Sequence, residues 1–378
     1  MRNAAEAIFW VSAGLLAWSQ VGYPLALAVI QALIRRPGSP APLEGDDLPN
    51  VTVVVAAYRE AAVIARKVDN LRSLDWPGER IKILIACDGS DDGTQQAARD
   101  AGADLVLDLP RGGKIATQNA AVRQADGEIV AFSDANALWQ PDALRALVAP
   151  FADQRVAYVC GRVRFDSGGG SNQEGLYWRY EMAIRGLESR LASVTAGNGA
   201  IYAVRRSDYV EVDPVMGHDL KLPFTLVKAG HRAVEAPAAQ ATELMTPSVE
   251  GEFARKRRMM SHAWPIVIRG GLLSPRGYSP LYALMIFSHR AIRYASPILH
   301  LLALAMSAIL APGSTFWTLV LALQLLVLVA AGLARWLRWR PLLVLRYYTL
   351  MTISIAAGGW DWARHGTPAG WEPPEGTR

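Results

Sequence analysis

The stretch VTVVVAAYRE, residues 51–60, decides the fold of this chain. It opens with an unbroken apolar run rich in valine, which is typical of a strand buried on both faces of a parallel sheet. Tyr58, Arg59 and Glu60 follow the run directly, and a helical pattern continues through residues 61–74. A buried strand followed at once by a helix predicts the beginning of an α/β domain.

The same strand-then-helix pattern repeats through residue 142. The sequence predicts strands at 81–87 (IKILIAC), 105–107 and 129–133 (IVAFS), and helices at 94–101, at 115–124 and from Pro141-Asp142 onward. This order predicts a parallel sheet with helices on both faces. Ligands of such sheets bind beyond the carboxyl ends of the strands.

Polar side chains gather where three of these strands end. A single acid at a strand end is commonplace and usually caps a helix, whereas three converging ends that carry acids and an aromatic ring favour a binding site. The chain contains neither a GxGxxG nor a GxxxxGK[ST] motif, so neither a dinucleotide fingerprint nor a P-loop is indicated. The side chains at the three ends are Tyr58, Arg59 and Glu60, then Asp88, Asp91 and Asp92, then Asp134 and Asn136.

Two features of this region suit a nucleotide diphosphate and its metal ion, one at a strand end and one at the start of a helix. Asp134 and Asn136 offer two hard oxygen ligands on one loop, as Mg²⁺ or Mn²⁺ requires. The turn Arg111-Gly112-Gly113-Lys114 opens a helix, whose free N–H groups, together with Lys114, can receive phosphate oxygens. Taken singly, Asp134 is equally well explained as a helix cap and Lys114 as a surface lysine.

The composition indicates a membrane protein. Of 378 residues, 51% are hydrophobic and 19% are charged, against about 25% charged in soluble proteins. This excludes a disordered chain, a collagen-like repeat and a coiled coil. Basic residues concentrate beyond residue 253 and flank apolar runs, so we expect contact with a lipid bilayer and not with nucleic acid. Cys87 and Cys160 are too few for a disulfide framework and show no zinc spacing.

The first membrane segment is predicted within residues 1–36. Residues 8–34 carry no charge, and as a helix they reach about 40 Å, enough to cross a core of about 30 Å. Pro24 is a candidate kink, and Arg35-Arg36 place the following segment in the cytoplasm. A cleaved signal peptide is the alternative, but its apolar core would span only about 7–15 residues.

Further membrane segments are predicted after a cytoplasmic domain at 48–250. A second charge-free stretch, 294–334, is interrupted at 311–314 and predicts helices at 295–311 and 315–334. The run 342–360 either spans or dips into the membrane, which gives two to three helices within 280–360 and leaves a tail at 361–378. The basic and apolar residues of 251–275 predict an amphipathic helix on the inner leaflet, with a plain surface helix as the alternative.

An ordered series of motifs resembles one enzyme family. The chain is similar to the membrane-bound, inverting family-2 glycosyltransferases that make bacterial surface polysaccharides. The resemblance implies the GT-A fold, which has a mixed, mostly parallel sheet. The motifs are AAYRE (56–60), CDGSDDGT (87–94), RGGKIATQNAA (111–121), FSDAN (132–136), YWRYEMAIRGLESRL (177–191), GNGAIYAVRR (197–206), HDLKLPF (218–224), EFARKRRM (252–259), SHRAIRYASP (288–297) and Trp371-Glu372-Pro373.

The resemblance also assigns roles to residues of this chain. Asp219 occupies the position of the catalytic base, and His218 replaces the acid that precedes it in the family. Asp134 and Asn136 occupy the metal-binding position, where the second residue is an amide instead of an acid. Arg255 and Met259 replace a glutamine and a tryptophan, and that tryptophan contacts the acceptor in processive synthases. The implied donor-binding residues are Ala57, Tyr58, Glu60, Asp88, Lys114, Asp134, Arg255 and Arg258, and the implied acceptor floor is Gly197, Asn198 and Gly199.

These residues predict a metal-dependent transferase in the inner (plasma) membrane with a cytoplasmic catalytic domain. It would move a sugar from a nucleotide sugar, with UDP as the implied carrier, to a lipid-linked or polysaccharide acceptor. His218 is predicted to be a neutral partner of Asp219 or a second base, with a water-facing loop histidine as the alternative. A processive synthase, which would need a homo-oligomer or a polysaccharide-export partner, and a non-catalytic nucleotide-sugar-binding subunit are the rival functions. A transporter is disfavoured, because the apolar segments lack carboxylates.

Overall fold

Strand β1 (Val51–Ala57) lies inside an eight-stranded sheet, and all seven of its residues are buried. We describe a computed structural model of the chain, which places residues 2–34, 45, 48–166, 173–244, 249–337 and 339–370. The strand order is β3-β2-β1-β4-β7-β6-β8-β5. The strands next to β1 are parallel to it, as expected for a continuous apolar run.

The sheet is mixed, because its second half adds antiparallel pairs. The parallel half consists of β3 (Leu105–Leu109), β2 (Ile81–Asp88), β1 and β4 (Ile129–Asp134). Beyond β4 lie β7 (Ile201–Arg205), β6 (Val156–Asp166), β8 (Arg232–Leu244) and the two-residue β5 (Leu138–Trp139). β7 is antiparallel to β4 and β6, whereas β6 and β8 are parallel. This confirms the expected fold class.

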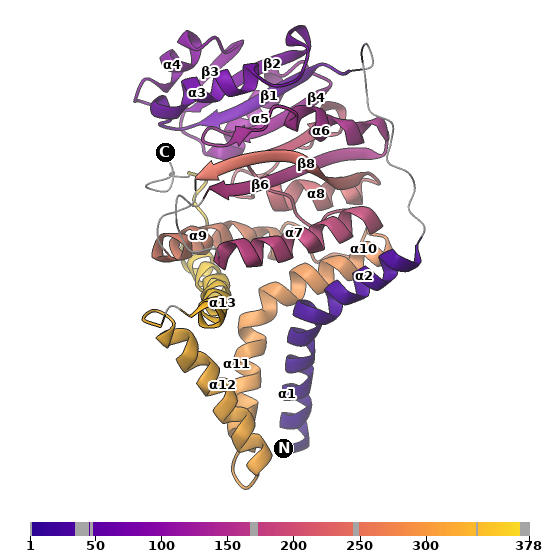
Figure 1. Cartoon of the computed structure of the whole chain (residues 1–378), viewed down its shortest axis with the longest axis vertical. Helices are drawn as coiled ribbons and strands as arrows, with labels where there is room; N and C mark the ends of the chain where they lie inside the picture. Colours follow the sequence, from indigo (N-terminus) through magenta and orange to yellow (C-terminus); the bar gives the residue numbers. More distant parts are fainter. Residues whose placement is uncertain are drawn as a thin grey trace.

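Successive residues of β1 face two separate hydrophobic cores, because side chains alternate across a strand. Val53 and Val55 pack on one face, which is covered by α3 (Ala61–Arg72), α4 (Thr94–Asp100) and α6 (Ala143–Val148). Val54 packs on the other face with α5 (Lys114–Gln124) and α8 (His218–Lys228). The short helices η3 (Gly78–Arg80), η4 (Ala149–Ala152) and η5 (Arg206–Asp208) connect elements of this domain. Helix α7 (Gln173–Leu191) lies between the sheet and the apolar helices (Figure 1).

Among the described residues, four segments are long and apolar enough to cross a membrane. The first comprises α1 (Arg2–Ala17), the π-helical η1 (Trp18–Gly22) and α2 (Tyr23–Leu33). The second comprises α10 (Pro280–Met285), the π-helical η6 (Ile286–Ala291) and α11 (Ile292–Leu310). The others are α12 (Thr315–Leu333) and α13 (Arg340–His365). Leu319, Leu323 and Leu326 of α12 are more than 60% exposed, as expected of a surface that faces lipid.

Helices α1, α11 and α12 project together away from the sheet, and the N-terminus lies at their far end (Figure 1). The first apolar segment bends at its π turn, before Pro24, so that α2 leans onto α7 (Figure 1). Trp18 Nε1 donates a hydrogen bond of 2.9 Å to Ser288 Oγ, which joins the two π turns. This bond holds the first two apolar segments together at their bends.

Helix α13 differs from those three in direction, since Figure 1 shows it nearly end-on. It packs along α9 (Val249–Ile268), and Trp264 Nε1 of α9 donates a 2.9 Å bond to Ile355 O of α13. Thr367, just after α13, donates a 2.7 Å hydrogen bond to Ser261 O of α9. Arg35-Arg36, Arg338 and Trp371-Glu372-Pro373 lie outside the described residues.

Helix α9 differs in two respects from the amphipathic helix expected at 251–275. It ends at Ile268, and its apolar residues Ala263, Ile266 and Val267 are buried inside the protein, at 6% exposure or less. These residues share a core with Tyr282 and Ile355 of the apolar helices. Helix α9 therefore joins the domain that contains the sheet to the apolar helices.

Candidate active site

A cavity of about 510 Å³ lies beyond the carboxyl end of β4 and extends to α9, α11 and α13. Most of the predicted site residues line this one cavity, although they come from elements far apart in the sequence. Ala57, Tyr58 and Asp88 do not line it. The residues that do are Glu60, Lys114, Asp134, Asn136, Gly197, Asn198, Gly199, His218, Asp219, Arg255 and Arg258.

One end of the cavity carries an ion pair between Lys114 Nζ at the start of α5 and Asp134 Oδ1 at the end of β4. Burial alone would lower the pKa of Lys114, but the attraction of Asp134 outweighs it and the pKa is raised. Glu243 of β8 also lines this part of the cavity, and burial and the nearby Asp134 raise its pKa to about 7. Both acids lie within the electrostatic reach of the lysine.

Asp88 shapes the turn that precedes Lys114. Its buried carboxylate accepts hydrogen bonds from Gly112 N at 2.6 Å, Gly113 N at 3.0 Å and Arg111 Nη1 at 2.7 Å. Gly113 has φ +92°, and a Cβ there would lie 1.9 Å from Ala369 O, so only glycine fits. Because the chain itself occupies both oxygens of Asp88, this carboxylate holds the turn in shape instead of facing the cavity.

Tyr58 is likewise covered by the chain. The guanidinium carbon of Arg111 lies 3.3 Å from the centroid of the Tyr58 ring, a close cation–π contact. The resemblance assigns donor binding to Tyr58 and Asp88, so a donor in that position would have to displace Arg111 or stack on it. The sequence did not predict the contacts of Arg111 with Tyr58 and Asp88, because these contacts depend on the fold of the turn 111–114.

Asp219 lies in the first turn of α8, next to the loop Gly197-Asn198-Gly199. Gly197 N donates a 2.7 Å bond to the Asp219 carbonyl oxygen, and a Cβ at Gly197 would lie 1.9 Å from Tyr158 Oη. The Asn198 side chain points into the protein, where Nδ2 donates to Gly161 O at 2.7 Å and Oδ1 accepts from Ile201 N at 2.9 Å. Asn198 therefore stabilises the loop, and its buried side chain is not directed at a ligand.

His218 is buried, and both of its ring nitrogens are engaged by tyrosines. Tyr209 donates its hydroxyl proton to Asn119 Oδ1 at 2.6 Å, so at 3.3 Å it accepts from His218 Nε2. Nδ1 then accepts from Tyr202 Oη at 2.7 Å. Burial and the nearby Lys114 charge lower the pKa of His218 to about 3. The ring is therefore neutral, does not face water, and lies in a tyrosine network instead of pairing with Asp219.

We expect His218→Gln to retain transfer activity within a few-fold but to change the response of stability to acid. Folded His218 stays neutral down to about pH 3, whereas an unfolded histidine binds a proton below about pH 6.5. The free energy of unfolding should therefore fall as the pH drops through this window, by about 2 kcal/mol between pH 7.5 and 5.0. Thermal unfolding at both pH values should show a smaller acid loss in the variant. A loss of transfer as severe as removal of a base would instead make His218 catalytic.

The donor set at the end of β4 fits a metal ion held jointly with a substrate. Asp134 and Asn136 both line the cavity and present hard oxygen atoms. In the parts of the chain that the structure describes, no group of three or more His, Cys, Asp and Glu side chains is placed to hold a metal. Mg²⁺ or Mn²⁺ would accordingly take its other ligands from a diphosphate and from water, as these ions commonly do.

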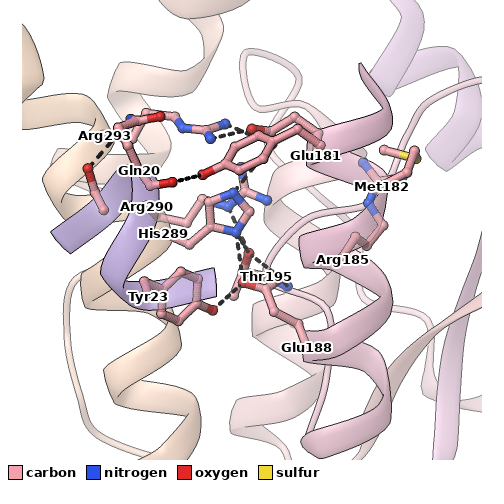
Figure 2. Close-up of polar contacts among 12 residues, drawn as sticks. Gln20, Tyr23, Glu181, Met182, Arg185, Glu188, Thr195, His289, Arg290 and Arg293 are labelled. Carbon is pink, nitrogen blue, oxygen red and sulfur yellow. Dashed lines mark hydrogen bonds and ion pairs between the residues drawn. The ribbon is translucent and has the colours of Figure 1, made fainter. Parts of the chain in front are cut away.

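A second polar cluster, which the sequence analysis missed, lies between α7, η1 and η6 (Figure 2). Its carboxylates are Glu181 and Glu188 on one face of α7, and His289 lies between them. Glu181, Arg185, Arg290 and Arg293 also line the cavity. Charged residues at the border of an apolar segment are a signal that could have revealed this cluster.

Comparison with known proteins identifies the family of the domain that contains this cavity. Residues 52–211 match the model of glycosyl transferase family 2. These residues form a family-2 glycosyltransferase domain. A beta-monoglucosyldiacylglycerol synthase of Synechocystis sp. is 34% identical over 38% of this chain and 32% of its own length. A poly-beta-1,6-N-acetyl-D-glucosamine synthase of Staphylococcus aureus is 23% identical over 64% of this chain and 61% of its own length.

A solved structure resembles the family-2 chain over nearly its whole length. It is the mannosyltransferase PcManGT from Pyrobaculum calidifontis, determined with GDP-Man and Mn²⁺. The TM-score is 0.75 and the identity 24%, and the match covers 96% of this chain and 99% of the other. This establishes the GT-A fold together with the arrangement of the apolar helices. By contrast, the chain matches less than two thirds of the length of the two curated relatives.

Proposed function

We propose that this family-2 glycosyltransferase moves a sugar from a nucleotide sugar, with UDP as the implied carrier, to a lipid-linked or saccharide acceptor. One observation carries the proposal: Asp219 and the Lys114–Asp134 pair line the same cavity. The loop 197–199 connects them, since Gly197 bonds to Asp219 and a Cβ at Gly199 would lie 3.5 Å from Lys114 Nζ. The Asp219 carboxylate and the Lys114 ammonium group, which would bind phosphate, thus lie next to opposite ends of this loop in one cavity.

The proposed reaction is a single displacement. Asp219 accepts the proton of the acceptor hydroxyl, because a free hydroxyl does not ionise near neutral pH. The acceptor oxygen forms a bond to the anomeric carbon, and the bond from that carbon to the diphosphate oxygen breaks on the opposite face. The electron pair leaves with the diphosphate, where Lys114 stabilises the growing negative charge. Attack opposite the leaving group inverts the anomeric centre.

The proposal includes Mg²⁺ or Mn²⁺, held by Asp134 and Asn136. When bound, the ion would act as a Lewis acid toward the diphosphate. Lys114 would then exchange its contact with Asp134 for a contact with phosphate oxygens. Arg255 and Arg258 of α9 line the same cavity and would bind the same diphosphate. The Mn²⁺ named with the mannosyltransferase structure supports the choice of metal.

We propose further that α1, α11 and α12 cross the inner membrane, with the catalytic domain on the cytoplasmic side. The three helices project to one side of the sheet, and α13 returns along α9, which supports three crossings (Figure 1). The cavity reaches Met351 and Ile355 of α13, so an acceptor held in the membrane could enter it from the lipid side. A homo-oligomer or an export partner belongs to the processive alternative.

A donor screen tests the function. Membranes supply the acceptor, and a panel of UDP- and GDP-sugars is assayed for released nucleoside diphosphate. We expect one donor to give acceptor-dependent release that EDTA abolishes, with one sugar added per acceptor. Products of many sugars would favour the processive synthase. Release from every donor no greater than with Asp219→Asn would contradict the proposal.

A further inference from the structure

Beyond the loop 197–199, the cavity wall toward η6 is basic. Arg185 of α7 donates a 2.9 Å hydrogen bond from Nη2 to Gly197 O, and Arg290 of η6 donates a 2.9 Å bond from Nε to Thr195 Oγ1. Both arginines line the cavity. They therefore hold the segment 195–199, which bonds to Asp219 through Gly197 N, at the end opposite Lys114.

Neither arginine forms an ion pair with any described residue. Arg185 is only 8% exposed, and its polar contacts are the Gly197 carbonyl and Met182 Sδ, the latter at 3.7 Å. A guanidinium keeps its charge in a protein, and a buried charge without a counter-charge is costly. This situation favours an anion in the adjoining part of the cavity.

The nearby carboxylates are already engaged by other groups (Figure 2). Glu181 pairs with Arg293 at 2.9 Å and with His289 Nε2 at 3.3 Å. Glu188 accepts from Tyr23 at 2.6 Å, from Thr195 Oγ1 at 3.0 Å and from His289 Nδ1 at 2.7 Å. Every carboxylate oxygen of Glu181 and Glu188 therefore has a partner other than Arg185 or Arg290.

The charges of this cluster do not cancel. Burial would raise the pKa of Glu181, but Arg293 and His289 hold it well below its usual range, so the acid stays ionised. His289 places each ring nitrogen against a carboxylate, Nε2 at 3.3 Å from Glu181 and Nδ1 at 2.7 Å from Glu188. Among the described residues of this cluster, the three arginines Arg185, Arg290 and Arg293 therefore face two carboxylates, Glu181 and Glu188.

The wall becomes apolar immediately beyond the arginines. Tyr294 of α11 and Met351 and Ile355 of α13 line that part of the cavity, and both helices are apolar enough to lie in a membrane. A ligand that matches this wall has an anionic head and an apolar tail. Its head would lie beside Asp219, on the far side of the loop from Lys114.

We propose that Arg185 and Arg290 form a subsite for the phosphate of a membrane lipid, and that this lipid is the acceptor. This inference rests on the function proposed above. The phosphate contacts the two guanidinium groups, the tail lies along α11 and α13, and a hydroxyl of the head group points at Asp219. The subsite thus selects a phosphate-bearing lipid over a neutral diacylglycerol.

Binding of short-chain lipids to the full chain in neutral detergent tests this subsite. Isothermal titration compares dihexanoyl phosphatidylglycerol, dihexanoylglycerol and inorganic phosphate. We expect the phospholipid to bind at least about tenfold more tightly than the other two. Arg290→Met and Arg185→Met should each weaken its binding by about tenfold or more, since each removes a charged hydrogen-bond donor. Arg290→Lys should lose less.

Two controls separate the subsite from the donor site. Arg276→Met changes an exposed arginine near the same helices and should bind the phospholipid like the native chain. Binding of UDP and GDP with Mn²⁺ should stay within twofold in every variant. If Arg185→Met does not fold, Arg290→Met decides the matter, because its guanidinium makes one side-chain bond, to Thr195.

Three results would overturn the inference. The first is equal binding of the phospholipid and dihexanoylglycerol, or no phospholipid binding at all. The second is equal binding of phospholipid and inorganic phosphate, which would leave a site for free phosphate without a lipid. The third is a parallel loss of UDP or GDP binding, which would assign the arginines to the donor. Intact phospholipid binding without turnover of any donor would instead contradict only the proposed transfer.

Discussion

Asp219→Asn is expected to lower kcat for sugar transfer by about 10²- to 10⁴-fold, the usual contribution of a positioned base. The amide keeps the size of the side chain but cannot accept the proton of the acceptor hydroxyl. The backbone bond from Gly197 N to Asp219 O does not involve the side chain, so the loop should stay in place. Released nucleoside diphosphate gives the rate, and titration of the donor should show affinity within about twofold.

Asp213→Asn is the matched control for this change. Asp213 is an exposed acid that precedes the same helix, and its Oδ1 accepts a 3.1 Å bond from Val215 N, which an amide oxygen can also accept. We expect native activity from this variant. Full transfer by Asp219→Asn would show that the base is another group. Glu243 is then the next residue to test, because it lines the cavity and its raised pKa of about 7 suits a base.

The parallel half of the sheet could be predicted because each strand is a continuous apolar run. Strand β1 has the same bounds as the apolar run in the sequence, and β2 and β4 extend only one residue beyond the predicted runs. The antiparallel half could not be predicted in this way. Strand β8 is rich in alanine and also contains Pro237 and the polar residues Glu235, Gln240 and Glu243. Nothing in this composition indicates a buried strand. Its place is set by pairing with β6.

The apolar helices were located by their lack of charge, but their geometry depends on packing. The helices predicted at 295–311 and 315–334 correspond to α11 and α12 within three residues. The two π turns were not predicted, because they depend on contacts between distant segments, such as Trp18 with Ser288. The direction of α13 likewise depends on its packing along α9.

The site was predictable from position where a residue lies at a strand end or helix start, as Asp134 and Lys114 do, whereas Asp219 was assigned only through the family resemblance. Strand order brings such residues together whatever surrounds them. Asp88 also ends a strand, yet its carboxylate turns onto its own loop, and only the fold of residues 111–113 decides that. Arg185 and Arg290 lie in the motifs at 177–191 and 288–297, but the sequence assigned them no role. Their importance follows from the absence of an ion-pair partner among the described residues.

Asp134→Asn is expected to lower kcat/KM by about 100-fold or more. It removes the only negative charge from the pair of oxygen ligands proposed for the metal, and such changes in metal sites commonly cost at least 10- to 100-fold in affinity or activity. It also removes the ionic partner of Lys114. The rate measured against Mn²⁺ concentration should therefore require more metal and reach a lower maximum.

Asn136→Asp is the opposite change on the same loop and should shift half-maximal activity to a lower Mn²⁺ concentration. A second carboxylate attracts the cation more strongly, because the amide contributes an oxygen without charge. The double exchange, Asp134→Asn with Asn136→Asp, restores one charge at the other position. Recovery of part of the lost activity in that variant would mean that charge at the metal is what Asp134 supplies. A metal response that is identical in all of these variants would place the ion elsewhere, and Asp134 would then act only through Lys114.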